Sequence, residues 1–455
     1  MKKNYTLGLI ALLFLTIKSN AQIIAVGDYN EYAICADNTL QAWGSGQFGA
    51  LGNGGVVPSS TPVQVNSLTG VIAVTAGNLH ALALKNDSTV WSWGFNQYGE
   101  LGDGTTNDSN VPIQVTSLSG IVAISARNKF SMALKSDGTV WVWGYCAGGQ
   151  LGDGTNNNSS VPVQVPSLTG IIAISAGDLH CLALKNDSTI WSWGRDVEGQ
   201  LGDGTNNNSY IPVPVSSLTG VVSIAGGFSY SMALKSDGSV WAWGIYTNTG
   251  QGNITSLNVP TQINSLTGTV AIACFNQSLA LKNDGTVRTW GSNYYGQFAN
   301  GTFQNSSTSP VLTNFTNVSK IAAGLKNPLV LKNDGTLWTA GFGGSFALGN
   351  GSGFGTDSHV PSQVIGNCQM IVTTTIETVE ELTPSIFPNP TSGQFIIALQ
   401  TDNAIISVTD ILGQQILKTQ ATQKTTNLQL DNNGVYIVYV TTKQGTTAQK
   451  LIVNH

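Results

Sequence analysis

The chain has 455 residues, a net charge of −5 and only 9% charged residues. This length predicts two or three domains. Because so little positive charge is available to attract phosphates, we expect no nucleic-acid partner.

The first 21 residues predict a secretory signal peptide. Lys2 and Lys3 are followed by an apolar run over residues 7–17 and by small residues ending at Ala21. This order is typical of a signal cleaved between Ala21 and Gln22. A membrane anchor is the alternative, but the apolar run is too short to span a bilayer comfortably. We therefore expect export, with no transmembrane segment once the signal is removed.

Residues 22–367 consist of seven copies of a unit of about 50 residues, which indicates a repeat architecture. A Trp-Gly pair marks the first six copies and Ala340-Gly341 marks the seventh, with spacings of 50, 50, 50, 50, 47 and 50 residues. The six tryptophans are Trp43, Trp93, Trp143, Trp193, Trp243 and Trp290.

Each copy predicts four short strands and no helix. In the third copy, apolar and polar residues alternate with the period of a strand, and Asp137-Gly138 forms a hairpin turn. The expected strands of this copy are 121–125, 130–134, 140–143 and 162–165. Seven such sheets bury their apolar faces by stacking around an axis, so we predict an all-β fold with a seven-bladed β-propeller. An open solenoid is the alternative.

Most copies carry a second tryptophan two residues before the Trp-Gly pair, as in Trp141 and Trp143. Residues two apart share one face of a strand, so we expect these rings in the core between blades.

The copies resemble the repeat of the regulator of chromosome condensation family. The matching pattern is H-x-x-A-L, D-G-x-V-W-x-W-G, G-Q-L-G-x-G and P-x-x-V, seen here in residues 141–144 and 149–154. The resemblance covers residues 23–367 and implies a seven-bladed propeller. The chain departs from the pattern at Gln41, Arg288, Phe298-Ala299 and the shortened segment 250–252. These departures indicate an asymmetric ring.

Five cysteines have no close-spaced pair, which gives no sign of a metal site or a disulfide framework: Cys35, Cys146, Cys181, Cys274 and Cys368. We expect them mainly to pack, and a single bridge in an oxidising compartment stays open. Whether the ring closes by borrowing a strand from its other end also stays open.

Residues 368–384 are rich in Thr, Val and Glu and predict a linker. Residues 385–455 predict a small β-sandwich, because short alternating strands are separated by turn residues. The expected strands are 395–399, 404–409, 427–430, 435–441 and 449–453.

This tail resembles the type A C-terminal sorting domain of type IX secretion. The matching residues include Pro388, Asn389, Pro390, Gly413, Gly434, Tyr436 and Lys450. The resemblance implies the type IX machinery as a partner and a location outside the cell or on its outer surface. It also implies that the tail is often removed and the passenger attached to a lipid-linked sugar. A retained carbohydrate-binding module is the alternative.

The sequence carries no recognisable catalytic motif, so we expect no enzyme, no catalytic residue, no cofactor and no metal. His80 and His180 share a register with Phe130 and Tyr230, which indicates packing. A polysaccharide-active enzyme is the alternative, and its acids would be Glu31, Asp178, Asp196 and Glu198. The recurring Asp-Gly-Thr loop at residue 103 leaves a Ca²⁺ site as a further alternative, although Asp, Asn and Gly also suit a tight turn.

The residues after each Trp-Gly pair vary between copies while their flanks stay fixed. These loops join strands, so we expect them on one rim of the ring, where binding residues usually lie. Many are aromatic, which favours binding of a protein or glycan by a non-catalytic, monomeric propeller. The alternatives are unconstrained loops on a structural adhesion element. The predicted binding residues are Phe95, Tyr98, Tyr145, Arg195, Tyr246, Tyr294, Tyr295 and Phe342, with Arg127 and Lys129 as a second candidate.

Overall fold

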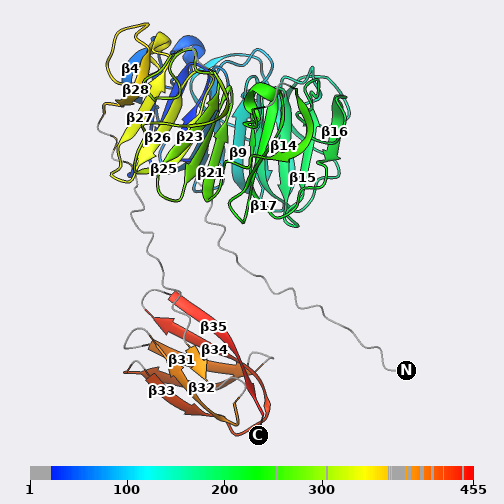
Figure 1. Cartoon of the computed structure of the whole chain (residues 1–455), viewed down its shortest axis with the longest axis vertical. Helices are drawn as coiled ribbons and strands as arrows, with labels where there is room; N and C mark the ends of the chain where they lie inside the picture. The colour runs from blue at the N-terminus through cyan, green and yellow to red at the C-terminus, as the bar shows by residue number, and fades with distance from the viewer. Residues whose placement is uncertain are drawn as a thin grey trace. The chain divides into compact units, whose positions relative to one another are not determined.

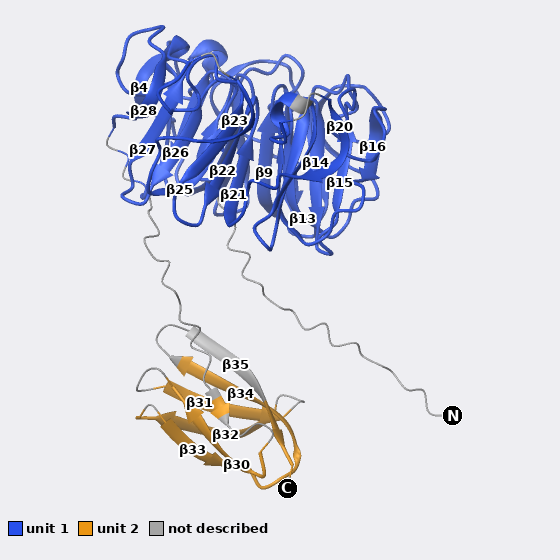
Figure 2. Ribbon diagram, in the orientation of Figure 1, with its two compact units in different colours: residues 1–372 blue, residues 373–455 orange. Residues whose placement is uncertain are grey.

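The chain divides into two compact units, residues 1–372 and 373–455 (Figure 2). The structure is a computed structural model. It describes residues 22–366 except 253–254 and 304–305, residues 368 and 370, and in the second unit 385–387, 391–399, 404–410, 414–423, 425–442 and 445–454. The predicted signal peptide and its Ala21 lie outside the described residues, and Gln22 is the first one inside them.

The first unit is a ring of seven four-stranded antiparallel sheets, which confirms the predicted propeller (Figure 1). Blade 1 contains β1 (Ile24–Val26), β2 (Asn30–Ile34), β3 (Leu40–Gly44) and β4 (Ser59–Gln64). Blade 2 contains β5 (Val71–Ala76), β6 (His80–Lys85), β7 (Val90–Gly94) and β8 (Ser109–Gln114). Blade 3 contains β9 (Ile121–Arg127), β10 (Phe130–Lys135), β11 (Val140–Gly144) and β12 (Ser159–Gln164). Blade 4 contains β13 (Ile171–Ala176), β14 (His180–Lys185), β15 (Ile190–Gly194) and β16 (Ser209–Pro214).

The remaining blades repeat this plan. Blade 5 contains β17 (Val221–Gly226), β18 (Tyr230–Lys235), β19 (Val240–Gly244) and β20 (Leu257–Gln262). Blade 6 contains β21 (Thr269–Cys274), β22 (Gln277–Lys282), β23 (Val287–Gly291) and β24 (Ser307–Leu312). Blade 7 contains β25 (Val318–Ala323), β26 (Pro328–Lys332), β27 (Leu337–Gly341) and β28 (Ser358–Gln363). Three short 3-10 turns are η1 (Gln47–Gly49), η2 (Tyr246–Asn248) and η3 (Gly344–Phe346).

Every blade is built from four consecutive strands, so the ring closes without a strand borrowed from its other end. A separate apolar cluster fills each of the seven seams between neighbouring blades. The last of these clusters joins Ile24 and Trp43 of blade 1 to Leu329 and Leu337 of blade 7. The apolar core of the ring therefore lies between the sheets, as the tryptophan pattern predicts.

The tryptophan of each Trp-Gly pair is completely buried and hydrogen-bonds to the preceding blade. Trp143 donates from Nε1 to the Glu100 carbonyl oxygen at 2.8 Å. The corresponding bonds of the other five tryptophans measure 2.7–3.2 Å and end on Ala50, Gln150, Gln200, Asn248 and, for Trp43, Ala347 of blade 7. One indole hydrogen bond therefore joins the two blades at each of six seams, including the seam that closes the ring.

This indole leaves no room for a side chain on the blade before it. A Cβ added at Gly102 would lie 2.7 Å from Trp143 Nε1, and at Gly102 φ is +73°. The glycines that face the other five tryptophans are equally confined, with distances of 2.5–2.9 Å to the indole nitrogen. Glycine is therefore required by sterics and by its backbone conformation.

Blade 6 lacks the glycine of this seam and blade 7 lacks the facing tryptophan, and these two departures from the repeat compensate each other. Ala299 occupies the register of Gly102 and keeps a positive φ of 52°. The residue across the seam is Ala340, which stands where the other blades have tryptophan, and both alanines are buried in the same apolar cluster. Because the indole is missing, a methyl group fits where glycine is otherwise needed.

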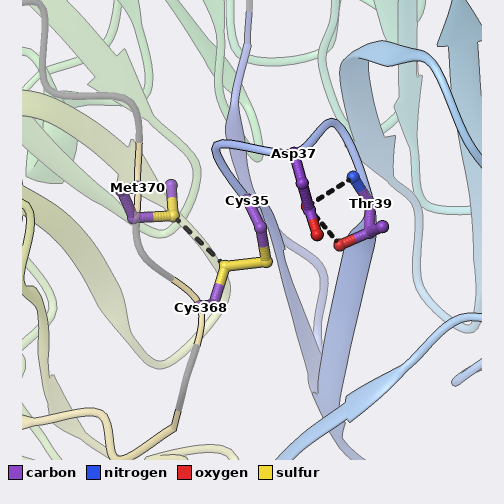
Figure 3. Close-up of a disulfide and its surroundings, with 5 residues drawn as sticks. All are labelled: Cys35, Asp37, Thr39, Cys368 and Met370. Carbon is purple, nitrogen blue, oxygen red and sulfur yellow. Dashed lines mark hydrogen bonds between the residues drawn. A yellow bond between two sulfur atoms is a disulfide. The ribbon is translucent and has the colours of Figure 1, made fainter.

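The seam between blades 7 and 1 carries a disulfide between Cys35 and Cys368, 333 residues apart in sequence (Figure 3). Three cysteines, Cys146, Cys181 and Cys274, are free and buried. Cys35 and Cys368 therefore form the single bridge that the sequence left open, instead of the packing role mainly expected of them. Sequence alone could not pair these two because only the closed ring brings them together.

Cys368 and Met370, which follow the last strand of blade 7, lie beside Gln41 of blade 1. Most other blades have tryptophan at the register of Gln41. Gln41, Trp43, Cys368 and Met370 line one hollow at this seam, with a volume of about 500 Å³. The Met370 sulfur lies 3.6 Å from Cys368 Sγ (Figure 3). Because the Gln41 side chain is smaller than that of tryptophan, it leaves room for Cys368 and Met370 at this seam.

The second unit is a β-sandwich. One sheet pairs β29 (Ser385–Phe387), β30 (Gln394–Ala398) and β33 (Thr425–Gln429). The other has the order β32 (Gln415–Ala421), β31 (Ala404–Asp410), β34 (Gly434–Thr442) and β35 (Gly445–Val453). The predicted strands are present, but β29 and β32 were not expected. β32 is an edge strand whose residues are mostly exposed, so its alternation of apolar and polar residues is weak.

Gly102→Ala should lower the free energy of unfolding by roughly 2–4 kcal/mol, because the added methyl overpacks Trp143 and strains a positive φ. Ala299→Gly in the same register should change it by less than about 1 kcal/mol. Chemical denaturation of the mature chain measures both changes. Equal effects would contradict the assigned steric role of the indole.

Replacing both Cys35 and Cys368 by serine should destabilise the ring by roughly 3–5 kcal/mol, because the bond constrains a very long loop in the unfolded chain. Thermal unfolding with and without reductant provides the measurement. Reductant should lower the melting temperature of the native chain to that of the variant and leave the variant unchanged. Five titratable thiols in the denatured, unreduced protein would show that the bond does not form.

Candidate binding face

One face of the propeller carries both the turn between the first two strands of each blade and the loop between the last two. This follows from the antiparallel order of each sheet, in which alternate connections lie at the same end. We call it the loop face. The opposite face, the turn face, carries the Lys-x-Asp turns such as residues 135–137.

Two lysines and two pairs of aromatic residues occur at the same registers on the loop face. Lys129 immediately precedes β10, and Lys326 lies two residues before β26, at the same register of the repeat. Tyr98 and Tyr295 lie in the last loop of the blade before. Tyr145 and Phe342 follow the third strand of the lysine's own blade. The same three-part arrangement therefore recurs at the seams between blades 2 and 3 and between blades 6 and 7.

At the seam between blades 2 and 3, the Lys129 ammonium lies 4.7 Å from the centre of the Tyr98 ring. The Tyr98 and Tyr145 rings meet edge to face with centres 5.1 Å apart. Both rings are half-buried. The packing holds a cation against an aromatic pair that still reaches solvent.

At the seam between blades 6 and 7, the Lys326 ammonium contacts three rings. It lies 4.1 Å from Phe342, 5.2 Å from Tyr295 and 5.0 Å from Tyr29 of blade 1. Tyr295 and Phe342 meet edge to face at 4.9 Å. Three blades thus contribute to one aromatic cluster around this lysine.

Further rings extend the surface across the seam between blades 1 and 2. Phe48 meets Phe95 edge to face at 5.1 Å, and Phe95 lies 6.3 Å from Tyr98. We call the whole set the aromatic arc, which runs over blades 6, 7, 1, 2 and 3 and comprises Tyr29, Phe48, Phe95, Tyr98, Tyr145, Tyr295 and Phe342. Blades 4 and 5 have Arg195 and Ile245 at the register of Tyr145, so the arc covers one side of the loop face, which we call its aromatic side. The other side carries a separate aromatic pair, Phe228 and Phe275, with ring centres 6.1 Å apart.

The structure brings five of the eight residues predicted from sequence into this arc: Phe95, Tyr98, Tyr145, Tyr295 and Phe342. Arg195 and Tyr294 are exposed outside it, Tyr294 to 70%. The backbone of Tyr246 lies in η2, and its side chain is outside the described part of the structure. Sequence reasoning missed Tyr29, Phe48 and Lys326. The register shared by Lys129 and Lys326 would have pointed to the lysine.

The axis of the ring forms a channel of about 480 Å³, lined by the innermost strands of all seven blades. Arg127 reaches across it, donating to the Val26 and Ala323 carbonyl oxygens at 3.1 Å and 3.3 Å and lying 4.4 Å from the Phe275 ring. Its guanidinium thus bonds to blades 1 and 7 instead of pointing outward. This argues against the Arg127 part of the second candidate site, whereas Lys129 does face the surface.

Two buried acids lie near Arg127. Burial raises the pKa of Asp28 to about 7 and that of Asp178 to about 6, although the positive charge of Arg127 opposes both shifts. Neither carboxylate has an oxygen within 4.0 Å of a basic side chain in the described residues. Both acids lie in the turns between the first two strands of their blades, on the loop face.

Comparison with protein families assigns the repeats. Residues 57–379, more than half of the chain, match the RCC1-like domain. The chain belongs to the RCC1-like family. Residues 385–454 match the secretion system C-terminal sorting domain, which marks this RCC1-like protein as one exported by the type IX route to the cell surface or beyond. Gly434 begins β34, and Tyr436 donates to the Asn432 carbonyl oxygen at 3.0 Å. Lys450 pairs with Ile437 between β34 and β35, whereas Pro388, Asn389, Pro390 and Gly413 lie outside the described residues.

Solved structures share the fold of the RCC1-like ring. The yeast RCC1 protein Prp20 bound to Kap60 is 24% identical with a TM-score of 0.65, covering 71% of this chain and 83% of that one. Prp20p of Saccharomyces cerevisiae in a second structure gives 24% and 0.65, with 76% and 88% covered. Human WBSCR16 gives 24% and 0.60, with 67% and 85% covered. A comparison with curated protein sequences finds no match. Within the described residues, no helix is long and apolar enough to cross a membrane.

The two repeat histidines of the RCC1-like ring pack between blades. His80 Nε2 lies 2.9 Å from Ser131 Oγ, and His180 Nε2 lies 2.9 Å from Ser231 Oγ, each on the following blade. Tyr230, in the same register, bonds to Ser278 at 2.6 Å. Burial lowers the pKa of both histidines to about 3, so they stay neutral. These contacts agree with a packing role.

The acids considered for an enzyme occupy four different environments. Glu31 is buried in the register of the seam residue Ser131, and burial raises its pKa well above the usual range. Asp178 lies in the turn before β14, Asp196 lies in the last loop of blade 4, and Glu198 accepts a bond from Ser256 at 2.9 Å. The four carboxyl groups do not form one cluster, and the described residues contain no group of three or more metal-ligating side chains.

The Asp-Gly-Thr loops considered for Ca²⁺ form side-chain turns. Asp103 Oδ1 accepts the Thr105 amide at 2.9 Å, and Asp153 does the same for Thr155 at 2.9 Å. The buried Asn96 side chain stabilises the first of these loops. It donates to the Asn107 carbonyl oxygen at 2.9 Å and accepts from the Leu101 amide at 2.9 Å. This arrangement favours the tight-turn interpretation of the loops.

Asp196 occupies the register of Asn96 and has a carboxylate oxygen in place of the amide NH2 group that donates hydrogen bonds there. Its Oδ1 accepts the Leu201 amide at 2.7 Å, while Oδ2 is buried without a hydrogen-bond partner. Burial raises the pKa of Asp196 to about 7. The folded chain therefore binds a proton that the unfolded chain releases above pH 4, so this group lowers stability as pH rises from about 4 to 7.

Asp196→Asn should raise the melting temperature at pH 7.5 by on the order of 2 °C and flatten its decline between pH 5 and 7.5. Asn96→Asp, which adds a buried carboxyl at the matching position, should do the reverse. Thermal unfolding of the mature chain across this pH range tests both. A lower melting temperature for Asp196→Asn at pH 7.5 would contradict the assignment.

Proposed function

We propose that this exported RCC1-like propeller is a non-catalytic binding protein whose aromatic arc captures a protein partner outside the cell. The observation that carries the proposal is the clustering of seven half-exposed rings from five consecutive blades on one face. Tyr and Phe provide large contact area with few rotatable bonds, so they dominate protein interfaces when gathered in this way.

The geometry of the rings favours a protein over a glycan. The pairs Tyr98–Tyr145 and Tyr295–Phe342 meet edge to face, so much of each ring face is used within the arc. A sugar ring stacks best on an open, flat aromatic face, whereas apolar protein side chains pack well against mixed edges and faces. The rigid blades beneath the arc lower the entropy lost on binding.

Changing Tyr98 and Phe342 together to alanine should weaken capture of the partner by more than tenfold, because each ring contributes to the centre of its cluster. Immobilised mature protein is incubated with the native surroundings, and bound proteins are quantified by mass spectrometry. Tyr294→Ala is the matched control, since this tyrosine is on the same face and exposed but outside the arc.

Three outcomes would contradict the proposal. Equal capture by the double variant and the native protein would remove the arc from binding. Capture of glycans alone, lost in the double variant, would make the arc a carbohydrate site. Hydrolysis of a glycan panel by the purified protein would favour the enzyme alternative.

A further inference from the structure

We propose that Lys129 and Lys326 are anion-binding residues, and that the partner of the aromatic arc presents a segment rich in Asp or Glu together with apolar side chains. This inference rests on the proposed function and names the chemistry of the partner. It depends on the register, the packing and the lack of ion pairing of these two lysines.

The register sets the two lysines apart from the rest of the ring. The residue at the register of Lys129 is Tyr29, Leu79, Leu179, Ser229 and Asn276 in blades 1, 2, 4, 5 and 6. Lysine stands there in blades 3 and 7, where the preceding blade contributes Tyr98 or Tyr295. The cation and its tyrosine therefore occur together, each time on the aromatic side of the loop face.

The rings hold each ammonium group in place before any partner arrives. Lys129 lies 4.7 Å from one ring centre, and Lys326 lies 4.1–5.2 Å from three. Contact with aromatic faces restricts the long side chain but supplies no negative charge. A partner carboxylate would meet a cation that has already lost part of its rotational freedom, so binding costs less entropy.

Three lysines on the turn face are paired within their own turns, which provides a comparison within the same molecule, whereas Lys235 has no carboxylate oxygen within 4.0 Å in the described residues and resembles Lys129 and Lys326 in this respect. Lys85, Lys135 and Lys185 lie 3.5 Å, 3.9 Å and 4.0 Å from the aspartate of their own turns. Lys129 and Lys326 have no carboxylate oxygen within 4.0 Å in the described part of the ring. Both side chains are partly exposed. Their charges remain open to an external anion.

The buried acids that these lysines influence, Glu100 and Asp28, do not cancel the two charges. Glu100 is buried beneath Tyr98, where its Oε2 accepts the Tyr98 amide at 2.9 Å. Burial raises the pKa of Glu100 to about 7, and burial likewise raises the pKa of Asp28, the acid influenced by Lys326, to about 7. Around neutral pH each carboxyl is therefore only partly ionised. These two buried acids therefore offset only part of the charge of the two lysines.

The test measures binding of three labelled peptides to the mature protein by fluorescence anisotropy. The peptides alternate Phe with Glu, Gln or Lys. Lys129→Met and Lys326→Met remove the charge and keep a flexible apolar side chain against the rings. Lys235→Met is the matched control, because Lys235 lies 5.6 Å from the Trp241 ring on the turn face.

We expect the Glu peptide to bind about tenfold more tightly than the Gln peptide. Each single Lys→Met change should weaken it about three- to fivefold and the double variant about tenfold. Lys235→Met should have no effect. Added salt should weaken binding of the Glu peptide far more than that of the Gln peptide.

Other results would overturn the inference in distinguishable ways. Equal binding of the Glu and Gln peptides, lost when Tyr98 and Phe342 are both changed to alanine, would keep the arc as a binding surface and remove its preference for anions. Stronger binding of a sulfated oligosaccharide than of the Glu peptide would assign the lysines to a glycan. No binding of any peptide, together with unchanged partner capture by the alanine variant, would reject both proposals.

Discussion

The hydrogen bond from one buried indole to a carbonyl oxygen of the preceding blade is the interaction on which the ring depends. It occurs at six of the seven seams, including the one that joins the two ends of the repeat array. Each bond fixes the distance between two sheets and the height at which they meet. The same indole excludes any side chain from the facing glycine, so a single side chain sets both the attraction and the spacing of a seam. A ring assembled from such equal joints places its loops at regular positions around the axis.

This regularity makes the differences between blades informative. The framework repeats, so two lysines at one register, each beside a tyrosine from the blade before, can be compared directly with five blades that lack them. The comparison separates residues that the framework needs from residues that vary on top of it. The aromatic arc belongs to the second class. It covers one side of the loop face, so the two sides of an otherwise repetitive ring present different surfaces.

Most of the fold could be predicted from sequence, because the framework residues repeat and their spacing is nearly constant. The period, the strand alternation and the Trp-Gly pair led to the propeller, and the tail residues led to the sorting domain. The disulfide could not be predicted, since Cys35 and Cys368 are distant in sequence and meet only in the closed ring. The candidate site was predicted in part. Variation after the Trp-Gly pair located Phe95, Tyr98 and Tyr145, but contacts made by Tyr29 and Lys326 depend on neighbouring blades.

The disulfide has a mechanical consequence for a protein handled through its C-terminal end. The outermost strand of blade 7 ends at Gln363, and the bond to blade 1 follows at Cys368. Tension applied to the following segment therefore reaches β2 of blade 1 through a covalent link before it can act on β28. Peeling that strand from its sheet would break backbone bonds one at a time, which requires little force, whereas the bridge directs the load across the seam. The ring can then be pulled or tethered from this end without losing its last blade.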